Sequence, residues 1–149
     1  MRFKAWKSLK KIVKNISKYL LISFYFQNSN KEKAAVSYQK AQQELAKFNT
    51  KASFLLQAAA WYNFGIVLKD KEGYPFVMDI LTKHAIPLTE KAGDKQKLAH
   101  YYSQFGTILM YNAQFDKATT YNQKAIDLLK KDFSNSSTSF KLRFWVISS

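Results

Sequence analysis

Apolar residues recur at helical spacing in stretches that short polar turns separate. Helical spacing places one residue of each turn on the same face, which is the pattern of a helix packed along one side. The stretches span residues 3–20 and, overlapping them, 15–27, then 32–47, 51–69, a segment that begins near Pro75, 95–111 and 116–131. The chain has only four Gly and two Pro in 149 residues, too few for the turns of a sandwich or barrel. We therefore predict an all-α protein.

The residues between these stretches predict where each helix begins and ends. Thr50 and Asp94 stand immediately before apolar-periodic stretches, where their side chains can cap a helix. Pro75 falls in the first turn of the next helix, where proline is tolerated. Pro87 lies inside that helix and is expected to kink or shorten it, because proline lacks a backbone donor and crowds the preceding turn.

An aromatic phrase recurs along the chain at a nearly fixed distance. The three copies begin 42 and then 41 positions apart, and they read Tyr19-x-x-Ile22-Ser23-x-x-Phe26, Trp61-x-x-Phe64-Gly65-x-x-Leu68 and Tyr102-x-x-Phe105-Gly106-x-x-Leu109. A period of this size indicates one pair of helices stacked on copies of itself. Because the aromatic residues recur at helical spacing, we expect Trp61, Phe64, Tyr102 and Phe105 to belong to the core.

A second helix in each unit carries small residues at matching positions. Ala34-x3-Tyr38-x2-Ala41 and Ala118-x3-Asn122-x2-Ala125 are 84 positions apart, twice 42. Small residues let two helix backbones approach, and a large neighbour fills the space beside them. In the second unit, however, Val77 and His84 occupy the places where small residues are expected.

Together these residues resemble the tetratricopeptide repeat (TPR). Its first helix, helix A, carries an aromatic residue followed by a large residue before Gly, and its helix B carries Ala, an aromatic residue and Ala. The period is longer than the common 34 residues and is similar to the long-helix variant of kinesin-light-chain-like repeats and bacterial regulators. The resemblance implies a right-handed superhelical array of antiparallel helix hairpins. It covers residues 16–131.

This resemblance also predicts the organisation of the chain. Residues 1–15 form a basic amphipathic helix, and three TPR-like hairpins follow at 16–50, 51–93 and 94–131. Residues 132–149 begin as a polar linker, and Phe144-x-x-Ile147-Ser148 repeats the start of the aromatic phrase. That last stretch is either a truncated fourth helix A or an apolar tail.

The same resemblance implies that the chain binds a protein or peptide. The positive charge of the chain favours an acidic ligand. TPR ligands lie along the A helices, and the positions carried over from the family form a partner groove. They are Leu20, Phe24 and Gln27 in the first unit, Ala59, Tyr62, Ile66 and Lys69 in the second, and His100, Ser103, Thr107 and Tyr111 in the third. The resemblance suggests the sensing or assembly part of a bacterial signalling or transcription regulator.

The net charge of +14 is concentrated near the N-terminus and gives a second hypothesis. No acidic residue precedes Glu32, and the basic patch consists of Arg2, Lys4, Lys7, Lys10, Lys11, Lys14 and Lys18. Such a helix can pack as an end cap, bind nucleic acid or an anionic membrane, or belong to a secretory signal. A cytoplasmic location is expected, or a secreted or periplasmic one if the segment is a signal.

The sequence offers no candidate for catalysis. It contains no Cys, its two histidines stand apart from any paired carboxylates, and its glycines are isolated. A metal site needs three or four ligands, and nucleophilic catalysis needs a base beside the nucleophile. We therefore expect no enzyme activity, metal, cofactor or small-molecule substrate.

Overall fold

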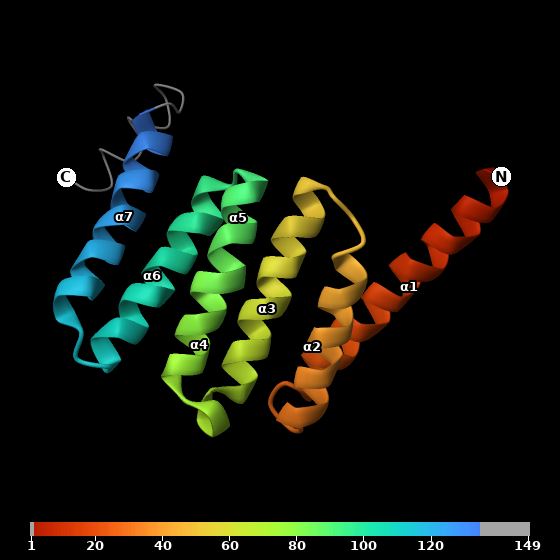
Figure 1. The fold of residues 1–149 in the computed structure, drawn as a ribbon, viewed down its shortest axis with the longest axis horizontal. Coiled ribbons are helices and arrows are strands. Elements are labelled where there is room, and N and C mark those ends of the chain that lie inside the picture. The colour runs from red at the N-terminus through yellow and green to blue at the C-terminus, as the bar shows by residue number, and fades with distance from the viewer. Residues whose placement is uncertain (1, 135–149) are drawn as a thin grey trace, which may run out of the picture. The chain divides into compact units, whose positions relative to one another are not determined.

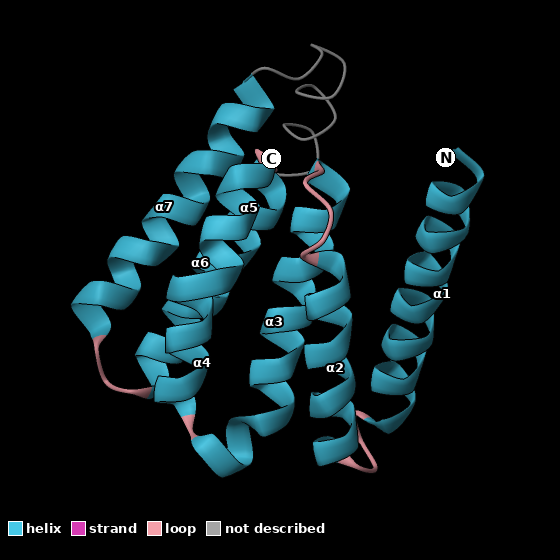
Figure 2. Ribbon diagram, turned by 45° about the vertical axis from the view of Figure 1, so that its right-hand side comes forward, coloured by secondary structure: helices cyan, strands magenta, loops and turns pink. Residues whose placement is uncertain are grey.

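The computed structural model describes residues 2–134, and this part of the chain is all helical, without strands (Figure 1). The helices are α1 (Arg2–Phe26), α2 (Lys31–Leu45), α3 (Lys51–Glu72), α4 (Tyr74–Ile80), the π-helical turn η1 (Leu81–Ala85), α5 (Ile86–Ala92), α6 (Lys95–Tyr111) and α7 (Phe115–Ser134). Because α4, η1 and α5 run on without a break, they form one helical segment. Six helical segments therefore pack in antiparallel pairs (Figure 2), and the all-α prediction is confirmed.

The chain divides into two compact units at the boundary between Gly93 and Asp94. We call α1 to α5 the N-terminal unit and α6 with α7 the C-terminal unit, and we describe each by itself. The repeated phrase predicted at Phe144 lies outside the described residues.

Side-chain caps begin α3 and α6. The Thr50 hydroxyl accepts a hydrogen bond from the Ser53 backbone N–H at 3.1 Å, and the Asp94 carboxylate accepts one from the Lys97 N–H at 3.0 Å. These bonds satisfy donors that the first turn of a helix leaves without an intrahelical partner. Gly93 closes α5 with a φ of +71°, a left-handed conformation that favours glycine. Both predicted caps are confirmed.

Small residues on α2 form the centre of the N-terminal unit. Ala34 and Ala41 are fully buried where α2 packs between α1 and α3, and Tyr38 is buried between them. Ala34 and Tyr38 cluster with Ala60 and Val67 of α3. The helix crossing predicted from the spacing of the alanines is therefore present, because methyl side chains allow the helix axes to approach closely.

Two buried side chains of α3 hold the end of α2. The Ser53 hydroxyl and the Gln57 amide both donate to the Leu45 carbonyl, and Gln57 also donates to the Ser53 oxygen at 3.0 Å. Leu45 is the last residue of α2, where carbonyls lack intrahelical partners. Side chains from the beginning of α3 thus donate hydrogen bonds to the last carbonyl of α2.

Pro87 does not shorten its helix, so that part of the prediction is wrong. The helix instead widens into η1, where the Ile86 N–H bonds to the Leu81 carbonyl five residues back, and it continues to Ala92. A proline crowds the carbonyl four residues before it, which here belongs to Lys83. The wider π turn just before Pro87 accommodates this crowding without ending the helix.

In the C-terminal unit, α6 and α7 form one hairpin. Ala118 and Ala125 of α7 are buried, as their spacing predicts. Phe105 is buried against Tyr121, with ring centroids 4.4 Å apart in an edge-on arrangement, and Gly106 faces Asn122. The sequence prediction of a helix at 95–111 matches α6 residue for residue.

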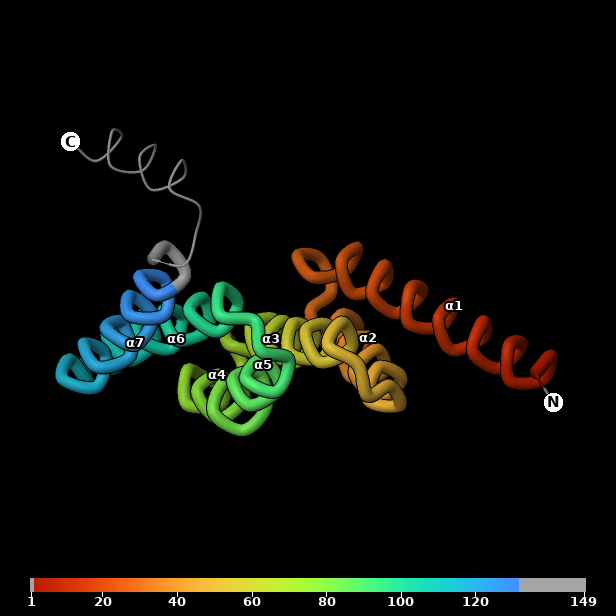
Figure 3. Tube along the Cα trace, turned by 90° about the horizontal axis from the view of Figure 1, so that it is seen from above, coloured from red at the N-terminus to blue at the C-terminus, as the bar shows by residue number. Residues whose placement is uncertain are grey.

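Helix α1 is longer than the partner it packs against. It has 25 residues and α2 has 15, and its N-terminal part runs away from α2 into open space (Figure 3). Ile16 and Ser23 are its buried residues. The basic segment and the first aromatic phrase, which the sequence treats as separate elements, therefore lie on one continuous helix.

Candidate partner-binding surfaces

Helix α3 carries the predicted groove residues of the N-terminal unit. Ala59, Tyr62, Ile66 and Lys69 follow one another at three- and four-residue spacing and so share one helix face. Ile66 is exposed, whereas the other three are half-buried, and burial raises the pKa of Tyr62 above its ordinary value. Lys69 lies over the Tyr74 ring, 5.7 Å from its centroid. Ile66 is therefore the most accessible member of this set.

The residues predicted on α1 differ in exposure. Phe24 is exposed, while Leu20 and Gln27 are half-buried. Gln27 accepts a hydrogen bond from the Tyr38 hydroxyl at 3.3 Å. Gln27 thus contributes to the packing of α1 on α2, and Phe24 is free of that role.

Helix α6 carries a more open row of predicted groove residues. His100, Ser103, Thr107 and Tyr111 are all exposed along one face. The Thr107 hydroxyl donates to the Ser103 carbonyl at 3.0 Å, which fixes its orientation along the helix. The structure therefore places the predicted residues of α3 on one helix face and those of α6 on another, whereas Gln27 of the first set lies immediately after the end of α1.

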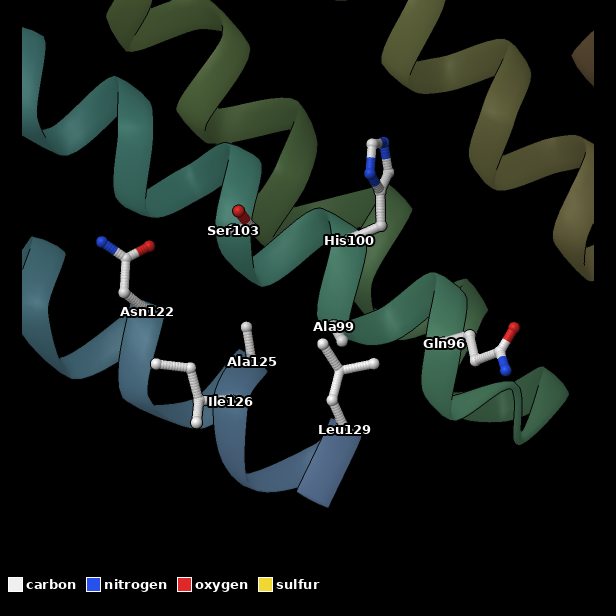
Figure 4. Close-up of a pocket in the computed structure, with 8 residues that line it drawn as sticks. All are labelled: Gln96, Ala99, His100, Ser103, Asn122, Ala125, Ile126 and Leu129. Carbon is white, nitrogen blue, oxygen red and sulfur yellow. The ribbon is translucent and has the colours of Figure 1, made fainter. Parts of the chain in front are cut away.

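A hollow of about 500 Å³ opens between α6 and α7 beside this row (Figure 4). Its apolar residues are Ala99, Ala125, Ile126 and Leu129. Its polar residues are Gln96, His100, Ser103 and Asn122. The apolar group lies between the two helices, while the His100 ring extends away from α7. The hollow thus combines an apolar floor with polar groups around it, the usual composition of a binding site.

The repeat relates this floor to a covered part of the N-terminal unit. Leu129 lies 84 positions after Leu45, the spacing that also relates the small residues of α7 to those of α2. Leu45 is only 3% exposed, and α3 packs on that end of α2. Leu129 is 38% exposed and Ile126 is 45% exposed. The floor of the hollow therefore corresponds to a surface that a helix covers in the N-terminal unit.

A ring stack in the N-terminal unit was not predicted from the sequence. The Trp61 and His84 rings lie 3.7 Å apart between centroids and within 5° of parallel. They border a hollow of about 380 Å³ that Lys83 and Lys91 also line. His84 is half-buried, and no local signal in the sequence links residues 23 positions apart. The stack exists because η1 packs across α3.

Burial in this stack lowers the pKa of His84 below its ordinary value; Lys83 adds to the effect and Asp79 opposes it. The unfolded chain keeps the ordinary value near 6.5, so it binds more protons than the folded chain as the pH falls through 6.5. The contribution of His84 to the free energy of unfolding is therefore expected to be fully present above pH 6.5. It is lost as the pH falls below 6.5 toward the lower pKa of the folded chain. His100, whose pKa is also lowered by burial and by Lys97, acts in the same direction.

Replacing His84 with Gln is expected to reduce this loss of stability between pH 8 and pH 5, leaving the part due to His100. Urea denaturation at both pH values measures the change, and NMR titration of the His84 ring measures its pKa directly. A pKa at or above 6.5 would contradict the prediction.

All seven residues of the basic patch are exposed on α1. Two of them lie over aromatic rings of the same helix: Lys7 is 4.7 Å from the Phe3 centroid and Lys10 is 5.9 Å from the Trp6 centroid. Within the described residues, no three His, Asp or Glu side chains gather as a metal site would require. Nor does any helix of residues 2–134 have the length and hydrophobicity to cross a bilayer.

Comparison with known proteins finds no protein-family model and no curated protein that matches this chain.

Proposed function

We propose that the chain is a helical-repeat scaffold of the TPR type that binds a protein or peptide segment. Antiparallel helix pairs and the buried alanines of α2 and α7 support this proposal. The resemblance extends it to a right-handed superhelical array and to the sensing or assembly part of a bacterial signalling or transcription regulator. The net charge of +14 favours acidic ligands.

The observation that carries the proposal is the hollow between α6 and α7. Leu129 remains exposed although Leu45, its equivalent 84 positions earlier, is covered by a helix, and Ile126 beside Leu129 is exposed too. An amphipathic helix or an extended segment can bury apolar side chains on such a floor. His100 and Ser103 line its edge. Binding energy at such sites usually depends on a few central apolar contacts.

A partner can be captured by a photo-crosslinking amino acid placed at position 107, which is exposed on the same face of α6, and then purified. We expect Ile126→Asp to weaken its binding at least tenfold, or about 1.4 kcal/mol, because a carboxylate would be desolvated on the apolar floor. Tyr111→Ala is expected to weaken binding in the same direction. Isothermal titration calorimetry measures both affinities, and circular dichroism checks that the variants are folded.

The matched control is Tyr25→Ala. Tyr25 is 76% exposed and Tyr111 is 70% exposed, so both substitutions remove an open tyrosine ring, but Tyr25 lies on α1. The control should bind like the unaltered chain. If Ile126→Asp and Tyr111→Ala retain full affinity, the site assignment on α6 and α7 is wrong.

A further inference from the structure

The N-terminal half of α1 has one strongly basic side. Helical geometry advances 100° per residue, so Lys4, Lys7, Lys10, Lys11, Lys14 and Lys18 fall within an arc of about 120°. No acidic residue occurs anywhere in α1. This side therefore presents an uninterrupted field of positive charge.

Apart from Arg2 at the start of the helix, the opposite side is apolar, and it is largely uncovered. Trp6, Leu9, Val13 and Ile16 fall within an arc of about 80° that faces away from the lysines. Ile16 is buried, but Trp6 is 55% exposed, Val13 is 51% exposed and Leu9 is 40% exposed. Phe3, which is 70% exposed, lies among the lysines instead. One apolar side thus begins in open solvent and passes into the core of the N-terminal unit.

We propose that residues 2–14 of α1 bind the surface of an anionic lipid bilayer. Helices with Trp, Phe and Leu on one side and Lys on the other lie in the interface, with the apolar side among the acyl chains. The lysines then meet anionic headgroups, which supply the complementary charge. The long lysine side chains can extend from the apolar boundary toward the headgroups. This inference is independent of the proposed binding at α6 and α7.

The apolar side favours lipid over nucleic acid as the occupant. Phosphate backbones are held by cations and hydrogen-bond donors, and such contacts do not require Leu9 or Val13 to be desolvated. A bilayer interface satisfies both sides of the helix at once, because it offers hydrocarbon beside negative charge. The two occupants therefore predict different effects of apolar substitutions.

The test uses the full chain and sedimentation with vesicles of phosphatidylcholine containing about one third phosphatidylserine. Binding is expected to these vesicles and to be at least tenfold weaker to phosphatidylcholine alone. Lys11→Gln with Lys14→Gln should weaken binding roughly 30-fold, at the usual contribution per lysine. The matched control is Lys117→Gln with Lys130→Gln, which removes two exposed lysines from α7 and should leave binding nearly unchanged.

Trp6→Ser with Leu9→Ser should also weaken vesicle binding at least tenfold, although all the lysines remain. Met110→Ser with Phe115→Ser, which removes two exposed apolar side chains of the C-terminal unit, is the control. Retained binding in the Trp6 and Leu9 variant would overturn the proposal. The proposal would also be overturned if the chain bound a single-stranded oligonucleotide but not the vesicles. Dimers that the Trp6 and Leu9 substitutions abolish would overturn it as well.

Discussion

Replacing Leu81 with alanine is expected to lower the free energy of unfolding of the N-terminal unit by about 2–5 kcal/mol. Leu81 has no exposed surface and lies in η1, between the buried residues Val77 and Ala85 on the same side of the helix. Removing its side chain loses apolar burial and leaves a cavity that the close-packed surroundings fill only in part. A unit of this size has a total stability of roughly 5–14 kcal/mol, so the loss is large.

Urea denaturation followed by far-UV circular dichroism measures this change. Thr82→Ala is the matched control, because Thr82 is the next residue and is exposed. Its hydroxyl donates only within its own helix, to the Met78 and Asp79 carbonyls. The control should change stability by less than about 0.5 kcal/mol. Equal effects of the two substitutions would mean that η1 is not packed as described.

Replacing Gly65 with valine is expected to lower the free energy of unfolding by about 1–3 kcal/mol through overpacking. A Cβ atom at Gly65 would lie 3.1 Å from the Cδ1 atom of Ile80, which is itself buried. The two extra methyl groups of valine then have no space between α3 and α4. Urea denaturation measures this change too.

A double-mutant cycle with Ile80→Ala tests this cause. Ile80→Ala alone should destabilise, but the combined variant should lose less than the sum of the single losses, by about 0.5–3 kcal/mol. Strict additivity would show that Ile80 is not the residue that excludes a side chain at Gly65. Gly106 offers a comparison, since a Cβ atom there would meet the side chain of half-exposed Asn122 instead. That side chain can rotate toward solvent, so Gly106→Val should be less damaging.

Local signals explain what could be predicted from the sequence. Thr50 and Asp94 act within three residues of themselves, and the period of apolar residues over 95–111 depends only on the helix to which it belongs. The buried alanines of α2 and α7 were also predictable, because their spacing repeats across the chain. These features need no knowledge of which helix packs on which.

The remaining features depend on contacts between residues distant in the sequence. Pro87 alone predicts a kinked or shortened helix, and the π turn that accommodates it lies in a segment packed along α3. The Trp61 and His84 stack likewise requires η1 to cross α3. In the predicted groove, spacing identified the shared helix faces, but the half-burial of Tyr62 and the exposure of Tyr111 depend on neighbouring helices.

The continuity of α1 has a geometric consequence. Its 25 residues make a rod of about 37 Å, at 1.5 Å per residue, without a proline, a glycine or any other hinge. Ile16 and Ser23 anchor the C-terminal half of this rod in the core, while the exposed Phe3 and Trp6 lie near its other end. Whatever surface holds the free end therefore sets the tilt of α2 and α3 as well. A surface that binds the N-terminal end of α1 would therefore orient the N-terminal unit as well as attach it.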